Sequence, residues 1–137
     1  MMYVLDASVV IKWFSEEEHT DKALEIRDKF LRGKCDIAVP DLLLYEVSNA
    51  LRYNPDFEEE DVNDAINSLF DMEIDIIVPI SKIIKSAINL AFKYDITIYD
   101  ATYVALAKEI RFTFITADNK LYRKIKELNL VKLISEI

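Results

Sequence analysis

Four acidic side chains are the part of this chain that is best suited to chemistry: Asp6, Glu46, Asp100 and Asp118. Three of them follow or open an expected helix or strand, and Glu46 lies inside an apolar helical stripe. Burying an unpaired carboxylate costs too much free energy to be kept without a purpose. Four such groups from distant parts of a chain make sense if they converge on a bound cation. Mg²⁺ or Mn²⁺ is the expected ion, because hard divalent cations prefer oxygen ligands.

A convergent set of carboxylates implies a definite kind of reaction. Neighbouring carboxylates repel one another unless cations bind between them. Such a site supports phosphodiester hydrolysis with two metal ions, in which one ion helps to generate hydroxide and both clamp the oxygens of the displacement. The hydroxyls of Ser8 and Thr116 and the amide of Asn49 are weaker candidates, expected to support the ligands rather than to bind the metal.

Each acid also has a simpler interpretation when it is taken alone. Asp6 and Asp118 stand where a helix would begin, and Asp is a preferred N-cap residue. Asp100 falls in the first turn of a helix, where the helix dipole favours an acid. Glu46 shares the inward stripe of residues 43–50 but can reach water from an edge position. The four together favour the shared site, because one α/β topology would gather them all.

The elements that must position these acids follow from the pattern of apolar residues. Short apolar runs predict strands, and longer stretches with helical periodicity separate them. This alternation is typical of a parallel sheet covered by helices on both faces, a three-layer α/β/α fold. The expected strands are residues 2–5, 37–39, 75–78, 112–116 and 130–134. The expected helices are residues 7–14, 20–32, 41–53, 58–71, 99–110, one that Ser81 can cap and one that Asp118 caps.

The place of the acids in such a sheet predicts where the site forms. In open α/β sheets, sites lie beyond the carboxyl ends of the strands, near a switch in strand order. Asp6 ends the first strand and Asp118 lies just beyond the fourth. If those two strands are neighbours, their carboxylates come together.

Length and composition set broad limits on what this chain can be. Its 137 residues fit one domain over residues 1–137, and 52% of them are hydrophobic. No apolar run approaches the roughly 20 residues that span a bilayer. Cys35 is the only cysteine, so no internal disulfide can form. With no secretion signal, we expect a cytoplasmic protein without membrane contact.

The charge balance bears on the substrate. The net charge of −8 argues against a protein that simply coats DNA, which would be basic overall. A short basic segment, Lys120, Arg123 and Lys124, follows Asp118 directly. It is either a solvated helix face or a rim that steers phosphates toward the acids.

Two further expectations concern apolar side chains. In the helix that Ser81 can cap, the helical spacing predicts an inward stripe. Its members are Ile84, Ala87, Ile88, Ala91 and Phe92. Four aromatic residues also remain outside the expected core and could serve a dimer: Trp13, Phe14, Tyr53 and Phe57.

Four segments carry a resemblance to a known family. The segments are Tyr3-Val4-Leu5-Asp6-Ala7-Ser8, Leu44-Tyr45-Glu46-Val47-Ser48-Asn49-Ala50-Leu51, Tyr99-Asp100-Ala101-Thr102-Tyr103-Val104-Ala105-Leu106-Ala107 and Thr116-Ala117-Asp118-Asn119-Lys120-Leu121. In their order and spacing the chain resembles the PIN-domain ribonucleases, and among them the single-domain VapC toxins. The resemblance covers essentially the whole chain.

The resemblance implies an Mg²⁺- or Mn²⁺-dependent endoribonuclease with a PIN-like α/β/α fold. It implies that Asp6, Glu46, Asp100 and Asp118 bind the metal, with hydroxyls matching Ser8 and Thr116 in the pocket. It also implies a homodimer and a small antitoxin protein as partner. The alternative is a non-catalytic PIN-like module that acts by binding a protein partner.

Overall fold

A single parallel sheet lies at the centre of the molecule, in a computed structural model that describes all residues from Met1 to Ile137. Its five strands lie in the order β3-β2-β1-β4-β5, and every neighbouring pair is parallel. The strands are β1 (Met2–Leu5), β2 (Asp36–Pro40), β3 (Asp75–Ile77), β4 (Thr113–Thr116) and β5 (Val131–Leu133). The prediction of an α/β fold with about five parallel strands is confirmed.

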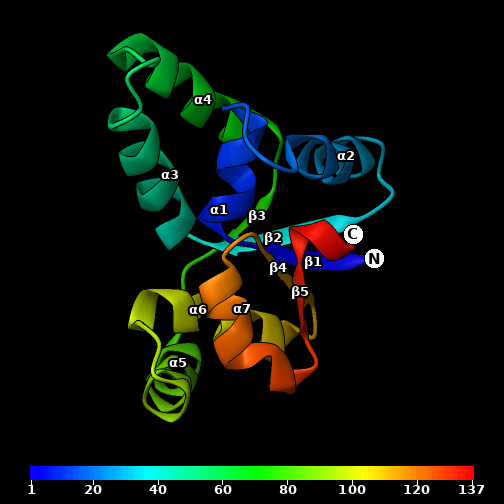
Figure 1. Ribbon diagram of the computed structural model, residues 1–137, viewed down its shortest axis with the longest axis vertical. Helices are drawn as coiled ribbons and strands as arrows, with labels where there is room; N and C mark the ends of the chain where they lie inside the picture. Colours follow the sequence, from blue (N-terminus) through cyan, green and yellow to red (C-terminus); the bar gives the residue numbers. More distant parts are fainter.

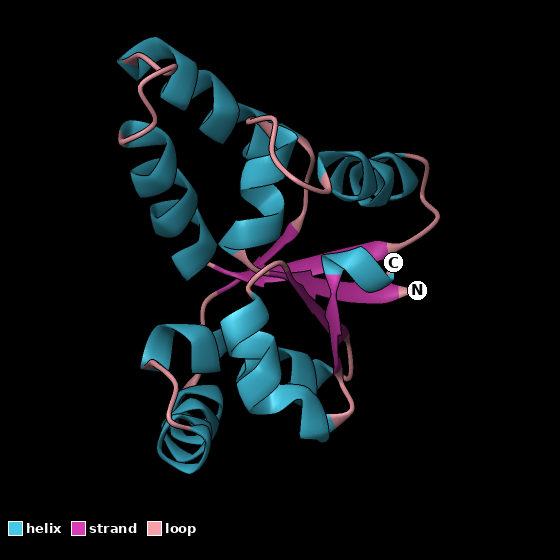
Figure 2. Ribbon diagram, viewed as in Figure 1, coloured by secondary structure: helices cyan, strands magenta, loops and turns pink.

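Helices cover both faces of this sheet, so the molecule has three layers (Figure 1). Helices α1 to α4 lie on one side and α5 to α7 on the other, with the strands between them (Figure 2). The helices are α1 (Ala7–Val10), α2 (Thr20–Leu31), α3 (Leu42–Arg52), α4 (Glu59–Asp71), α5 (Ser81–Tyr94), α6 (Ile98–Ile110) and α7 (Asn119–Ile125). Three short 3-10 helices are η1 (Ile11–Trp13), η2 (Lys126–Leu128) and η3 (Ile134–Glu136).

The order of the strands places a switch point beside β1. The chain builds outward from β1 through β2 to β3, then returns through α5 and α6 to form β4 on the other side of β1. Leu5 pairs with Ile115 across the two central strands. Connections therefore leave β1 and β4 in opposite directions, and this leaves a crevice at their carboxyl ends where ligands bind in such sheets.

Helix α6 is the central helix of its layer. All seven residues from Ala101 to Ala107 are buried, as expected for a helix that is apolar on most of its surface. Three alanines in this segment allow close packing on the sheet. Tyr103 stacks on Phe114 of β4 with ring centroids 6.1 Å apart. This packing fixes the helix that carries Asp100 against the strand that precedes Asp118.

The end of α2 shows why the only glycine of the chain lies where it does. Gly33 has a φ of 70°, a left-handed conformation that glycine adopts without steric cost. Its N–H donates to the carbonyl of Phe30, and the N–H of Lys34 donates to the carbonyl of Lys29. These two bonds form a Schellman motif, which ends α2 and turns the chain toward β2.

Two expectations about apolar side chains are wrong in part. Helix α5 buries Ala87 and Ala91 of the predicted stripe, but its other buried residues are Ile83 and Leu90. Ile88 is 43% exposed and Phe92 is 86% exposed. The helix packs along α6, whose direction selects a face rotated from the one that periodicity alone favoured. Trp13 is not a spare aromatic, because it is buried and its indole N–H donates to the carbonyl of Ala23 at 2.8 Å.

No helix in the structure is both long enough and apolar enough to cross a membrane.

Candidate metal-binding active site

Asp6 lies at the switch point and is the most buried of the four acids. It follows β1 directly and is only 7% exposed. Its backbone N–H donates to the carbonyl of Ile115, at a donor–acceptor distance of 3.4 Å, which extends the pairing of β1 with β4. Its Oδ1 also accepts the N–H of Val9 at 3.3 Å and so caps α1. The capping role expected for an isolated aspartate is therefore real, but it occupies only part of this carboxylate.

Two hydroxyl groups hold both oxygens of this carboxylate. Ser8 Oγ donates to Oδ1, and Thr116 Oγ1 donates to Oδ2, each at 2.5 Å. Both hydroxyls are themselves fixed, because Ser8 Oγ accepts the N–H of Ala117 and Thr116 Oγ1 accepts the N–H of Asp118. The network joins the start of α1 to the end of β4. It places Ser8 and Thr116 beside Asp6, where the sequence predicted them.

Glu46 comes to the site from α3, which lies across the sheet from α6 (Figure 1). It is held by Tyr103, a residue that sequence analysis did not single out. The glutamate is half-buried, and its Oε1 accepts a hydrogen bond from the phenol of Tyr103 at 2.6 Å. Tyr103 is 1% exposed, so its hydroxyl has little freedom to move. A buried tyrosine needs a polar partner for its hydroxyl, and that requirement was the signal available in the sequence.

Asp100 and Asp118 complete the group at the beginnings of α6 and α7. The Asp100 backbone N–H donates to Thr97 Oγ1, which caps α6, and its own carboxylate is half-buried. The Asp118 carboxylate is exposed and caps α7 by accepting the N–H of Leu121 at 3.0 Å. Both acids line one hollow of about 240 Å³ at the mouth of the site.

Charge interactions link Asp100 to each of the other three acids. Burial raises the pKa of Asp6 to about 6, and the Asp100 charge adds to this rise. The pKa of Glu46 is raised by burial and by Asp100. The pKa of Asp100 is raised by burial and by Asp118. Asp100 is therefore coupled to all three other acids, although they lie far apart in the sequence.

No lysine, arginine or histidine of the protein forms an ion pair with these four acids, since the six ion pairs of the structure lie elsewhere. As the side chains stand, no three His, Cys, Asp or Glu side chains are arranged to hold a metal ion. The donor set nevertheless fits a hard divalent cation, since it consists of carboxylate oxygens that form no ion pair.

The remaining predicted residues lie around this centre in different ways. Asn49 lies one turn beyond Glu46, exposed, and lines a hollow with it rather than binding an acid. Lys120 and Lys124 line the same hollow as Asp100 and Asp118. Lys124 is engaged, because its Nζ donates to the carbonyl of Asp95 at 2.7 Å. Arg123 is exposed on α7 and does not line that hollow.

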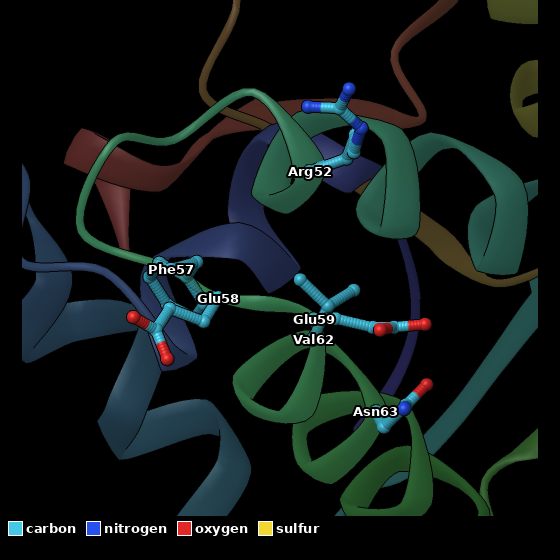
Figure 3. A pocket seen from close by; sticks show the side chains of 6 residues that line it. All are labelled: Arg52, Phe57, Glu58, Glu59, Val62 and Asn63. Atoms are coloured by element: carbon cyan, nitrogen blue, oxygen red, sulfur yellow. The ribbon is translucent and has the colours of Figure 1, made fainter.

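A second hollow is chemically different and is not a candidate for the same reaction. It lies between the end of α3 and the start of α4 and measures about 410 Å³. Figure 3 shows the side chains around it. They are Arg52, Phe57, Glu58, Glu59, Val62 and Asn63. Its two glutamates are exposed, so water screens them, and none of the four acids reaches it.

Comparison with known proteins shows which family this chain matches. The model of the family described as "PIN domain" matches residues 3–127. The curated protein Ribonuclease VapC3 of Pyrobaculum aerophilum is 29% identical over 132 residues, which cover 93% of this chain and 98% of that protein.

Two solved structures share the fold over nearly their whole length. The crystal structure of PAE2754 from Pyrobaculum aerophilum has a TM-score of 0.70 at 21% identity, covering 99% of this chain and 91% of that one. A toxin–antitoxin complex from Klebsiella pneumoniae contains a chain with a TM-score of 0.74 at 18% identity, covering 98% of this chain and 99% of that one.

Proposed function

Because the chain belongs to the PIN domain family, we propose that it is a metal-dependent endoribonuclease that hydrolyses RNA phosphodiester bonds. The observation that supports this proposal best is the gathering of acids at the switch point, where β1 pairs with β4. Thr116 bonds both the Asp6 carboxylate and the backbone of Asp118, and Asp100 lines one hollow with Asp118. The chain is also similar to Ribonuclease VapC3 over 98% of that protein. The proposal includes one domain over residues 1–137 and a cytoplasmic location.

The proposed metal ligands are the four acids, and they differ in how they would contact the ion. Asp6, Asp100 and Asp118 would hold Mg²⁺ or Mn²⁺, and Glu46 would bind it directly or through water. A divalent ion held there would make water more acidic and would offset negative charge on the phosphate. Ser8 and Thr116 hold the orientation of the Asp6 carboxylate, and Oδ2, which accepts only the Thr116 hydroxyl, keeps a lone pair that an ion could use.

The other residues of the site act on the ligands and on the substrate. Tyr103 fixes Glu46 through a buried phenol. Burial raises the pKa of Tyr103, and its hydrogen bond to Glu46 and the nearby carboxylate charges raise it further, so the phenol stays protonated and remains a donor. Lys120 is exposed beside Asp100 and Asp118, where it can attract a phosphate group. Steering of this kind weakens as salt concentration rises.

The likeness to a chain in a toxin–antitoxin complex supports a biological setting for this activity. We propose that the chain is the toxin of such a pair, with a small antitoxin protein as its partner, and that it forms a homodimer. The alternative, a non-catalytic PIN-like module, has one observation in its favour: the side chains are not arranged around a metal position. The complete set of four acids argues for the enzyme.

The test is cleavage of several RNA classes with and without Mg²⁺ or Mn²⁺. We expect wild-type protein to cleave RNA internally, and only with metal. Asp64→Asn is the matched control, because Asp64 is an exposed acid on α4. Asp100→Asn should be inactive while Asp64→Asn retains activity. Metal-independent cleavage, or none with any RNA, would contradict the proposal.

A further inference from the structure

A shallow groove beside Glu46 is not used by the chemistry described above. It has a volume of about 490 Å³ and is lined by Leu42, Tyr45, Glu46, Asn49 and Tyr99. Glu46 is part of its lining, so the groove shares one of the four acids with the site. A molecule that contacts Glu46 at the site therefore lies at the edge of this groove.

The two tyrosines of this groove present bare aromatic rings to solvent. Tyr45 is 73% exposed and Tyr99 is 62% exposed. They come from the two helical layers on opposite sides of the sheet, since α3 and α6 lie on different faces (Figure 1). Exposed apolar surface marks a binding site when it is contiguous rather than scattered, and both tyrosines line the same groove.

The chemistry of an RNA base matches what the groove offers. Aromatic side chains bind unpaired bases by stacking on their faces, and this works for any base. The Asn49 amide carries both a donor and an acceptor for a base edge. Stacking needs no positive charge, which matters in a chain with a net charge of −8 that attracts the phosphate backbone poorly.

We propose that Tyr45 and Tyr99 form a nucleobase-stacking subsite in which an unpaired RNA base next to the scissile phosphate lies against their rings, with its edge toward Asn49. This inference rests on the proposed ribonuclease function and names how its substrate is held. It predicts that the enzyme cleaves RNA within unpaired segments, whose bases can unstack from their neighbours. A base locked in a duplex cannot enter the groove.

The experiment compares kcat/KM for one RNA oligonucleotide across single variants. Tyr45→Ala and Tyr99→Ala remove a ring each. Tyr53→Ala is the matched control, because Tyr53 is also 73% exposed but lies at the end of α3, away from the acids. Loss of a stacked base corresponds to about tenfold to hundredfold in kcat/KM. We expect that loss in the two groove variants and not in the control.

An abasic substitution scanned along the oligonucleotide identifies the base concerned. Next to the cut site it should lower wild-type kcat/KM by a similar factor, and it should have no further effect in Tyr45→Ala. Tyr45→Phe, which keeps the ring, should recover most of the activity lost in Tyr45→Ala. The native mass and the thermal midpoint of each variant should match those of the wild type.

Three results would overturn the inference. Groove variants as active as Tyr53→Ala would remove the stacking subsite and leave the ribonuclease proposal standing. Loss of activity together with a change from dimer to monomer would assign the tyrosines to contact between two copies of the chain. Wild-type protein that cleaves no RNA in Mg²⁺ or Mn²⁺ would remove both the proposed function and this subsite.

Discussion

Replacing the buried carboxylate at the switch point should stabilise the metal-free protein. Burial raises the pKa of the wild-type Asp6 side chain from 3.8 to about 6. A shift of about two pH units corresponds to roughly 3 kcal/mol of destabilisation when the group is ionised, at ~1.4 kcal/mol per unit. Asp6→Asn removes that charge and keeps the size and shape of the side chain.

The variant loses part of the hydrogen-bond network, which reduces the gain. The introduced amide retains an oxygen acceptor for Ser8 and Val9, but its NH₂ group faces Thr116 Oγ1, which in the wild type donates to Asp6. The threonine hydroxyl must turn, and Ser8 Oγ at 3.4 Å is the alternative partner. Losing one good hydrogen bond costs about 1 kcal/mol. We therefore expect a net gain of roughly 2 kcal/mol in the free energy of unfolding at pH 8, from the same two estimates.

The sign of the pH dependence follows from the direction of the shift. The folded state binds the Asp6 proton more tightly than the unfolded state. The free energy of unfolding of the wild type therefore falls as pH rises from 3.8 to about 6, and Asp6 changes it no further at higher pH. The advantage of Asp6→Asn is thus absent at the acid end, where the lost hydrogen bond makes the variant slightly less stable. It is complete above about pH 6.

The assay is urea unfolding followed by circular dichroism between about pH 3 and pH 8, so that it begins below the unfolded pKa of Asp6, in a chelator and then in saturating Mg²⁺. Asp64→Asn is the control for an exposed acid. Mg²⁺ should raise the stability of the wild type and not that of Asp6→Asn, since binding to the native state stabilises it. If Asp6 were only an N-cap, Asn would cap equally well. Equal stability of the variant and the wild type at every pH would then refute the reasoning.

Three further predictions concern activity. Asp100→Asn should lower RNA cleavage at least a hundredfold, because the charge of Asp100 is linked to those of all three other acids. Without metal, its unfolding midpoint should stay unchanged or rise. Cleavage at the wild-type rate would contradict its role. Tyr103→Phe removes the hydroxyl that donates to Glu46. Because this bond lowers the pKa of Glu46, its loss should move the acid limb of the pH–rate profile to higher pH. An unmoved limb would show that the phenol does not act on catalysis. Lys120→Ala should raise KM severalfold at low salt and have little effect on KM at high salt. Lys124→Ala should have a smaller effect, because that ammonium already contacts Asp95. Equal effects of the two variants at all salt concentrations would argue against phosphate steering.

The overall arrangement was predictable because local patterns were consistent with one another. Met2–Leu5 is an apolar run ended by Asp6, and it forms β1 with the same bounds. The prediction that Asp6 and Asp118 would come together depended on the first and fourth strands being neighbours, and β1 does pair with β4. Topology of this kind follows from sequence because parallel strands require crossovers and because sites form at the switch between them.

Contacts between helices were less predictable, because they depend on packing directions that periodicity does not contain. The exposed ring of Phe92 and the buried indole of Trp13 are examples of this limit. Tyr103 is a similar case at the site. In the sequence its ring is one more apolar group of α6, and only the approach of α3 from the opposite layer shows that its phenol reaches Glu46.

The central claim is that the four carboxylates form one divalent-cation site, and anomalous scattering from a crystal grown with Mn²⁺ tests it most directly. We predict a strong anomalous peak about 2.1 Å from carboxylate oxygens of Asp6, Asp100 and Asp118, with Glu46 in contact or one water away. A peak elsewhere on the molecule, or no peak in crystals of protein that cleaves RNA, would contradict the claim.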